Sequence, residues 1–282
     1  MGVATSQQIT KYFERYRGID VTFTKEIINA TGLVTKQIYL KCLGESWPCV
    51  LYSSSFESAK VIVNARSGLY EKIQRANNLV SIRYSFKESD KVDPFMFFVA
   101  GRAAGFAPYG GSPDVAMLTV AFTQRPPDDL IEIMGRLLDA NINSTKRREE
   151  RIMLTPDAMR RLRLISKETA IFIQGVPRRC ILRDISFSGA KVIMVGVAKF
   201  LTDREVAIRL DFDDPRESTL IKGKIVRTED VEGRKDLVAM AINFAEQTTP
   251  MAYKLRINDY ITQVRADTRG EGAADGAEST TP

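Results

Sequence analysis

Residues 179–193, Arg-Cys-Ile-Leu-Arg-Asp-Ile-Ser-Phe-Ser-Gly-Ala-Lys-Val-Ile, decide the fold of this chain, because an earlier stretch repeats them. Residues 48–62, Pro-Cys-Val-Leu-Tyr-Ser-Ser-Ser-Phe-Glu-Ser-Ala-Lys-Val-Ile, align with them at an offset of 131 residues, with eight of fifteen positions identical. Self-similarity of this kind indicates two copies of one structural unit.

Two further similarities extend the repeat. Residues 80–86 (Val-Ser-Ile-Arg-Tyr-Ser-Phe) parallel residues 206–212 (Val-Ala-Ile-Arg-Leu-Asp-Phe). Each half also ends in the same way, with an apolar strand followed by a helix. The strands are expected at 115–123 and 236–244, and the helices at about 127–142 and 249–265. The offset changes along the chain, as loop insertions would cause.

Most segments between these points are short, apolar or alternating, and rich in β-branched residues, which is typical of strands. Thr249 before Pro250 is a typical helix start. The pattern predicts a mainly β chain with peripheral helices, in which two related β-barrels follow one another. In the second half, strands are expected at 170–174, 179–185, 190–195, 205–212, 220–228 and 237–244.

The amino-acid composition limits the partners and the catalytic groups that this chain can have. The net charge of +6 favours anionic partners such as phosphates, nucleotides or nucleic acid, although a solvated basic surface would also explain it. Histidine is absent, which excludes catalysis and metal ligation by imidazole. Cys42, Cys49 and Cys180 fit no zinc spacing and are expected as free buried thiols in a reducing cytosol. No apolar run reaches the length of a membrane span.

Two motifs occur only in the second half. Arg147-Arg148-Glu149-Glu150-Arg151 is an R-x-x-x-R element, and Asp184-Ile185-Ser186-Phe187-Ser188-Gly189 is a D-x-S-x-x-G element that follows a strand. Alone, the first is typical of a solvated charged face. The second alone is typical of a strand-ending turn, in which Asp bonds the backbone and Gly supplies a positive φ.

In this order, before a strand series and a terminal helix, the motifs resemble the PilZ family over about 147–265. The helical stretch 155–165 looks like an insertion. The resemblance implies two PilZ-like six-stranded split β-barrels in tandem and a binding site for cyclic di-GMP. It also implies the ligand-binding residues, which are Arg147, Arg151, Asp184, Ser186 and Gly189, with Lys146 and Arg148 as further candidates.

The chemistry of these side chains suits that ligand. Guanidinium groups match phosphate oxygens and the O6/N7 edge of guanine, and they stack on the base. The carboxylate of Asp184 can accept hydrogen bonds from the guanine N1–H and N2–H₂ groups. Gly189 is expected to let the backbone approach a bulky ligand.

The first half lacks these groups. Ser53 and Ser58 stand where Asp184 and Gly189 stand, and the segment 15–19 holds no R-x-x-x-R. The predicted organisation is therefore a degenerate PilZ-like domain at 1–142, a linker at 143–151, a PilZ domain at 152–265 and a disordered tail at 266–282. The first domain is expected to pack against or orient the second, with an independent ligand site as the alternative.

The functional hypothesis is a cytoplasmic, monomeric receptor for cyclic di-GMP that acts on an unknown downstream protein, without catalysis, cofactor or metal. The resemblance implies a role in motility or virulence regulation. One alternative is a nucleic-acid-binding module, and another is a nuclease or phosphodiesterase. The nucleic-acid module would use the basic surface formed by 146–151, Arg160, Arg161, Arg163, Arg178, Arg179 and Arg183. The enzyme alternative is weakened because the acidic stretch 211–215 is more typical of a turn than of a metal site.

Overall fold

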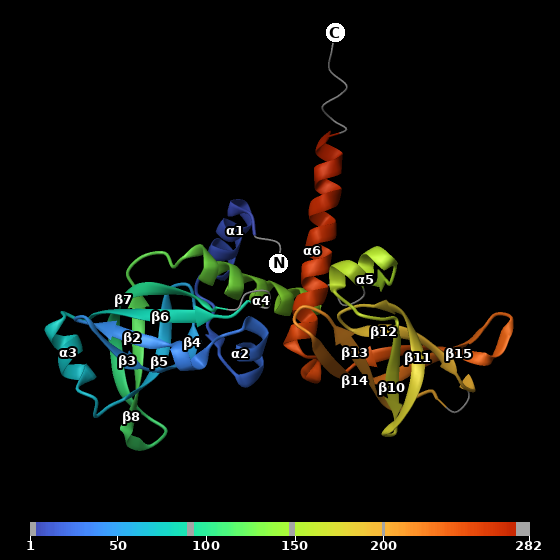
Figure 1. The fold of residues 1–282 in the computed structure, drawn as a ribbon, viewed down its shortest axis with the longest axis horizontal. Helices are drawn as coiled ribbons and strands as arrows, with labels where there is room; N and C mark the ends of the chain where they lie inside the picture. Colours follow the sequence, from blue (N-terminus) through green and yellow to red (C-terminus); the bar gives the residue numbers. More distant parts are fainter. Residues whose placement is uncertain (1–3, 89–92, 147–149, 199–200, 275–282) are drawn as a thin grey trace, which may run out of the picture. The chain divides into compact units, whose positions relative to one another are not determined.

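The computed structural model describes residues 4–88, 93–146, 150–198 and 201–274 (Figure 1). The chain divides into two compact units, Met1–Leu138 and Asp139–Pro282.

An eight-stranded antiparallel sheet forms the N-terminal unit, in the order β1-β4-β5-β8-β7-β6-β2-β3 among the described residues. Its strands are β1 (Val21–Thr22), β2 (Tyr39–Cys42), β3 (Glu45–Pro48), β4 (Val50–Ser54), β5 (Ser58–Asn64), β6 (Leu79–Phe86), β7 (Phe95–Tyr109) and β8 (Ser112–Phe122). Its helices are α1 (Ser6–Tyr16), α2 (Lys25–Thr31), the 3₁₀ turn η1 (Thr35–Gln37), α3 (Leu69–Arg75) and most of α4 (Asp128–Lys146).

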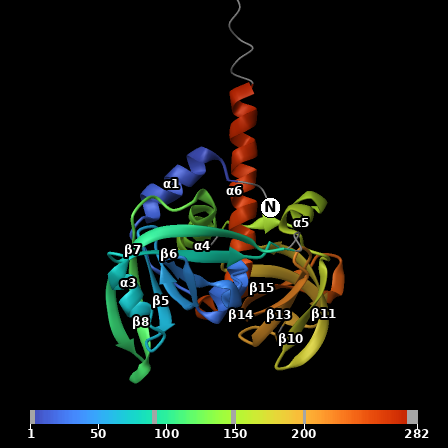
Figure 2. The same cartoon turned by 60° about the vertical axis from the view of Figure 1, so that its left-hand side comes forward.

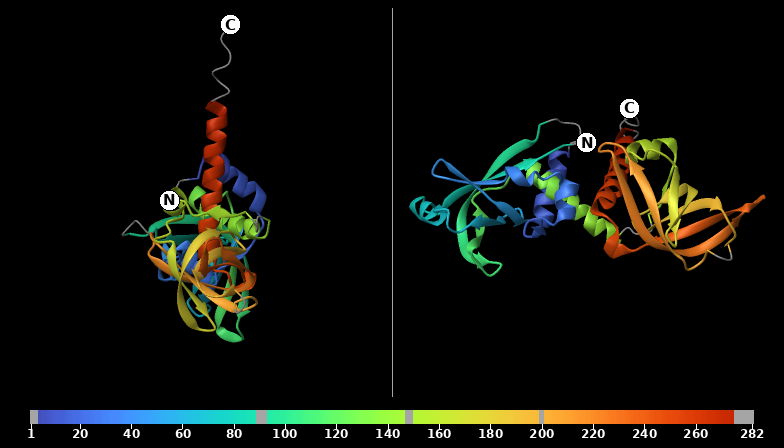
Figure 3. Two further views of the ribbon diagram at one scale, coloured as in Figure 1. Left: turned by 90° about the vertical axis from the view of Figure 1, so that its right-hand side faces the viewer. Right: turned by 60° about the horizontal axis from the view of Figure 1, so that its bottom comes forward.

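A closed barrel forms the C-terminal unit. Its sheet runs β10-β13-β14-β15-β12-β11, an additional β10–β11 pairing closes it, and β9 attaches to β11. The yellow and orange strands in Figure 3 curve around this closed wall. The strands are β9 (Ile152–Met153), β10 (Glu168–Ile173), β11 (Val176–Ile185), β12 (Gly189–Val195), β13 (Glu205–Phe212), β14 (Glu217–Val231) and β15 (Arg234–Phe244). The helices are α5 (Pro156–Leu162), the 3₁₀ turn η3 (Glu246–Thr248) and α6 (Met251–Ala274).

These sheets confirm the mainly β fold with peripheral helices and the six-stranded barrel of the second half. The apolar alternation of the barrel strands produces one core, to which α6 adds Tyr253, Ile257 and Ile261. Burial of Cys180 in this core raises the pKa of its thiol to about 12. The three cysteines are free and buried, as expected.

The repeat has a matching backbone in the two units. Val21 and Thr22 of β1 pair with Ser54 and Ser53, while Ile152 and Met153 of β9 pair with Ile185 and Asp184. All of these positions keep the offset of 131 residues. A β-bulge follows in each copy, between Leu51 and Ser53 and between Leu182 and Asp184.

The helix that follows β1 or β9 also repeats. Thr24 caps α2 by accepting a hydrogen bond from the Ile27 amide, and Thr155 caps α5 by accepting one from Ala158. The left-handed C-cap residue is Gly32 at φ 71° in the first copy and Arg163 at φ 56° in the second. The stretch 155–165, which looked like an insertion, is therefore part of the repeated unit.

Helix α4 continues beyond the expected end at 142, and its last turns belong to the C-terminal unit. There Asn143 is buried, and its amide donates to Asp139 at 2.9 Å and to Asn258 of α6 at 2.7 Å. Residues 143–146 are thus helix, where the sequence placed the start of a linker.

Helix α6 runs to Ala274, whereas the sequence predicted disorder over 266–282; residues 275–282 lie outside the described part. Figures 1 and 2 show α5 beside the lower half of α6, and beyond α5 the helix extends away from the barrel. Just beyond residue 265, Asp267 pairs with Arg161 of α5, and this ion pair stabilises the continuation of the helix.

Candidate functional site

Asp184 reaches the outer surface of the barrel because of the bulge before it. Leu182 pairs with Val192, and both side chains are buried inside the barrel. One residue is then inserted, so Asp184 pairs with Lys191 and with Met153, whose side chain is exposed. A bulge shifts the alternation of side chains between the two faces of a strand. The carboxylate is therefore on the outside.

Arg151 and Asp184, one from each motif, lie together. The Arg151 Nη1 donates to Asp184 Oδ1 at 2.5 Å. The side chain of Asp184 is 8% exposed and that of Arg151 is 39% exposed. The carboxylate is therefore largely covered, and the guanidinium is the part of the pair that solvent reaches. Among the described residues, Arg151 is the one hydrogen-bonding partner of this carboxylate.

Ser186 builds the turn between β11 and β12. Its amide donates to the carbonyl of Gly189 at 2.8 Å, and its carbonyl accepts from the Tyr253 hydroxyl of α6 at 2.7 Å. Its side chain is fully buried, and its hydroxyl lies 3.4 Å from the Gly189 carbonyl oxygen. Burial of the Tyr253 phenol, which makes this hydrogen bond, raises its pKa. Ser186 therefore holds the turn that follows Asp184.

Gly189 is required by strand packing. It is not among the residues with positive φ. A Cβ at this position would lie 2.2 Å from the carbonyl oxygen of Ile242 on β15. The sequence explained the glycine by a left-handed turn or by a backbone that approaches the ligand. In the structure, a glycine is needed here because the backbone of residue 189 packs closely against β15.

The remaining predicted residues lie in the segment that enters the barrel. Lys146 is the last residue of α4 and is exposed. Arg147 and Arg148 fall at 147–149, outside the described residues, so the structure does not place them. Glu150, between the two arginines of the motif, pairs with Arg265 of α6 at 2.8 Å.

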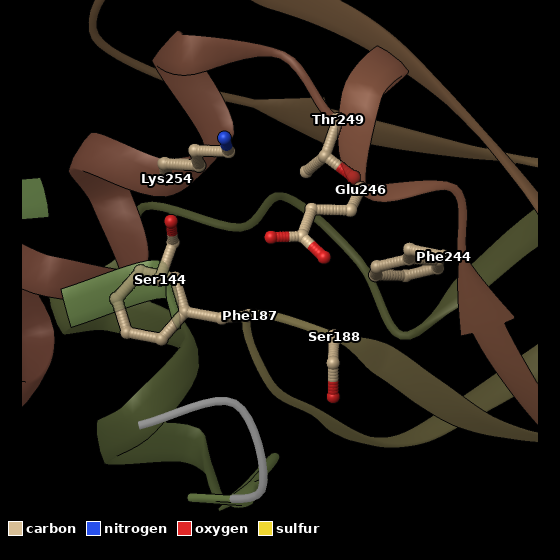
Figure 4. Close-up of a pocket in the computed structure, with 7 residues that line it drawn as sticks. All are labelled: Ser144, Phe187, Ser188, Phe244, Glu246, Thr249 and Lys254. Carbon is tan, nitrogen blue, oxygen red and sulfur yellow. The ribbon is translucent and has the colours of Figure 1, made fainter. Parts of the chain in front are cut away.

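A small pocket lies beside the motif turn (Figure 4). The carboxylate of Glu246 projects between the other lining residues, and Lys254 of α6 lies across the pocket from Phe187. The pocket shares only the turn residues Phe187 and Ser188 with the motif, so it is separate from the Arg151–Asp184 pair. Its lining residues are Ser144, Phe187, Ser188, Phe244, Glu246, Thr249 and Lys254.

The equivalent place in the N-terminal unit has different groups. Ser53 stands where Asp184 stands, and its buried hydroxyl has no hydrogen-bonding partner among the described residues. Asp20 stands where Arg151 stands and accepts from Lys60 at 2.7 Å. The backbone of the site is repeated without its charges.

The described residues contain no cluster of three or more side chains that could hold a metal ion, and no helix among them is long and apolar enough to span a membrane. In the acidic stretch 211–215, Asp211 and Phe212 end β13, and residues 213–215 lie in the turn that follows. Asp211 accepts from Arg209 and Ser218, and Asp214 pairs with Arg163 before a cis bond to Pro215.

Comparison with known proteins defines the class. The PilZN3 domain model matches residues 7–141, and the PilZ domain model matches residues 145–263. The chain belongs to the PilZ family, with a PilZN3 domain followed by a PilZ domain. It is 46% identical over 266 residues to a cyclic di-GMP binding protein of Treponema denticola, covering 94% of this chain and 85% of the relative.

Two solved structures of complexes with c-di-GMP are among those to which the chain is similar. The Borreliella burgdorferi PlzA protein in complex with c-di-GMP has 25% identity and a TM-score of 0.41, covering 90% of this chain and 98% of PlzA. Escherichia coli YcgR in complex with c-di-GMP has 10% identity and a TM-score of 0.30, covering 96% and 99%.

Proposed function

We propose that this protein is a receptor for cyclic di-GMP. The observation that carries the proposal is the Arg151–Asp184 pair on the outside of the barrel, which offers a guanidinium and a carboxylate at 2.5 Å. The relative from Treponema denticola, named as a cyclic di-GMP binding protein, supports the choice of ligand.

The ligand would break the Arg151–Asp184 ion pair and bind both side chains. Arg151 would turn from Asp184 to a phosphate or a guanine face, together with Arg147 from the same segment. Asp184 would accept from the guanine N1–H and N2–H₂ donors. Ser186 and Gly189 complete this wall through the turn that they build, and Lys146 and Arg148 add positive charge.

Signal output would follow from the position of the arginines. Arg147 and Arg151 lie directly after α4, the helix that joins the two units, so fixing them on a ligand restrains this connection. We expect the ligand to change the arrangement of the units or the surface presented to a downstream protein. Small-angle scattering with and without saturating ligand distinguishes the two, since only a rearrangement alters the profile.

The nucleic-acid alternative has less support. Three arginines of the proposed basic surface are neutralised by nearby carboxylates. Arg160 and Arg161 pair with Asp157, and Arg163 pairs with Asp214. Calorimetric titration with cyclic di-GMP and with an unrelated single-stranded oligonucleotide separates the alternatives. The receptor proposal requires saturable binding of the dinucleotide.

A further inference from the structure

Beyond the two motifs, Asp184 belongs to a row of side chains across the outside of the barrel. Antiparallel partners lie on the same face of a sheet, so the register of the strands defines the row. We call it the outer row. From β9 to β14 its members are Met153, Asp184, Lys191, Ala241 and Arg227.

Two β-bulges turn the charged residues Asp184 and Arg227 of this row toward the outside of the barrel. The bulge between Leu182 and Asp184 turns Asp184 outward. A second bulge, between Ile225 and Arg227 of β14, does the same for Arg227, because Ile225 is buried in the barrel. Bulges often re-aim side chains next to functional sites. Both strands thus depart from regular pairing at the same level of the barrel.

Lys191 and Arg227 converge on one carboxylate. Lys191 Nζ lies 2.9 Å from Glu229 Oε2, and Arg227 Nη2 lies 2.8 Å from Glu229 Oε1. The hydrogen bond from Lys191, followed by the charges of Lys191 and Arg227, lowers the pKa of Glu229. Two cations therefore share one anion, beside the carboxylate of the motif.

The space between the two cations is shallow. Lys191 on β12 and Arg227 on β14 are separated by β15, whose outward residues there are Ala241 and Ala239. Methyl groups rise little above the sheet, but Ala239 is buried and the Lys191–Glu229 ion pair crosses β15, so a ligand can lie over β15 where it takes the place of that ion pair. With about 4.8 Å between strands, Lys191 lies about 5 Å and Arg227 about 14 Å from Asp184 along the row.

The N-terminal unit supplies an internal comparison. It has the same two bulges, at Leu51/Ser53 and at Ala103/Gly105. Its equivalent row carries a lysine but neither the acid nor the arginine, and its central position is larger than alanine. The members of that row are Thr22, Ser53, Lys60, Thr119 and Gly105. The repeated backbone does not by itself require the charges at Asp184 and Arg227.

We infer that Lys191 and Arg227 anchor a phosphate of the dinucleotide whose guanine is bound at Asp184, and that Glu229 holds the two cations in place until the ligand arrives. This inference rests on the proposed function. The phosphate is joined through one ribose to the guanine, which keeps it close to the neighbouring strands. On binding, the phosphate replaces or shares the place of the Glu229 carboxylate, because both anions suit the same two cations.

The test is calorimetric titration of the full chain with cyclic di-GMP. Lys191→Gln and Arg227→Gln should each weaken binding by about fivefold to thirtyfold, as expected for a charge-assisted contact that is partly exposed to solvent. Glu229→Gln should strengthen binding by about twofold to fivefold, because a competing anion is removed. Affinity for cyclic di-AMP should change by the same factors, since the phosphates of the two ligands are identical.

The matched control is Arg234→Gln, at the far end of the same hairpin. Arg234 is exposed and pairs with Asp236 at 2.9 Å, so the variant loses the same charge and a similar ion pair. It should bind like the unmodified protein. If Lys191→Gln and Arg227→Gln bind like Arg234→Gln while the unmodified protein binds cyclic di-GMP, the anchor is wrong and the receptor proposal stands. If the unmodified protein does not bind, the receptor proposal itself fails.

Discussion

Replacing Asp184 by asparagine tests whether this carboxylate selects guanine. The side chain keeps its size and one acceptor oxygen, but it loses its charge. The structure predicts little effect on folding. Arg151 is 39% exposed and can be hydrated when its partner becomes neutral, so the free energy of unfolding should fall by less than about 1 kcal/mol.

Binding should change much more. The guanine N1–H and N2–H₂ groups require two acceptors, and the asparagine amide offers one oxygen and a competing donor. A lost charge-assisted contact costs about 1.5–3 kcal/mol, which is roughly a tenfold to hundredfold loss of affinity for cyclic di-GMP. Affinity for cyclic di-AMP, which lacks these donors on its base edge, should change far less, so the ratio of the two affinities should shrink.

Calorimetry with both dinucleotides measures this ratio directly. Asp211→Asn is a suitable control, because Asp211 pairs with Arg209 at 2.8 Å on the same barrel and away from the motifs. A variant at Asp184 that kept both its affinity and its preference for guanine would refute the reasoning, and it would leave Asp184 only the structural role of holding Arg151.

Three further predictions concern the arginine, the two units and the glycine. Arg151→Ala should weaken cyclic di-GMP binding by about tenfold to a hundredfold without changing the thermal midpoint by more than a few degrees, whereas Arg209→Ala should leave the calorimetric affinity unchanged. A fragment of 139–274, which retains the contacts of Asn143 with Asp139 and Asn258, should bind cyclic di-GMP in calorimetry, whereas a fragment of 1–138 should not. Binding of cyclic di-GMP by the fragment of 1–138 would show that a serine at position 53 does not abolish the site. Gly189→Ala should lower the free energy of unfolding, measured in urea, by about 2 kcal/mol or more, because the new Cβ would lie 2.2 Å from the Ile242 carbonyl oxygen. Gly105→Ala is the control: its Cβ would have no neighbour closer than 3.8 Å, so it should cost about 1 kcal/mol or less.

The sequence predicted the fold well where the repeat was readable. The stretch around Asp184 and its copy around Ser53 indicated paired strands, and both copies form the same bulged hairpin. The end of α4 could not be located in this way. Its polar residues 143–146 look like a linker, and only the contact of Asn143 with Asn258, far along the chain, shows that they are packed helix.

The candidate site was predicted in part. The motifs indicated Arg151 and Asp184, and the two side chains do meet. Lys191, Arg227 and Glu229 were missed, because their meeting depends on register and on a bulge near Val226, neither of which follows from the local pattern. The retained lysine of the repeat, at Lys60 and Lys191, was the one signal that pointed toward them.

The central claim is that this chain binds cyclic di-GMP at the outer face of its C-terminal barrel, and one measurement tests it most directly. Cyclic di-GMP is titrated calorimetrically into the full chain and into the double variant Arg151→Ala, Asp184→Ala. Saturable binding by the full chain, lost in the double variant while its circular dichroism spectrum is unchanged, is the predicted result. No heat with the full chain, or equal affinity in the folded double variant, would contradict the claim.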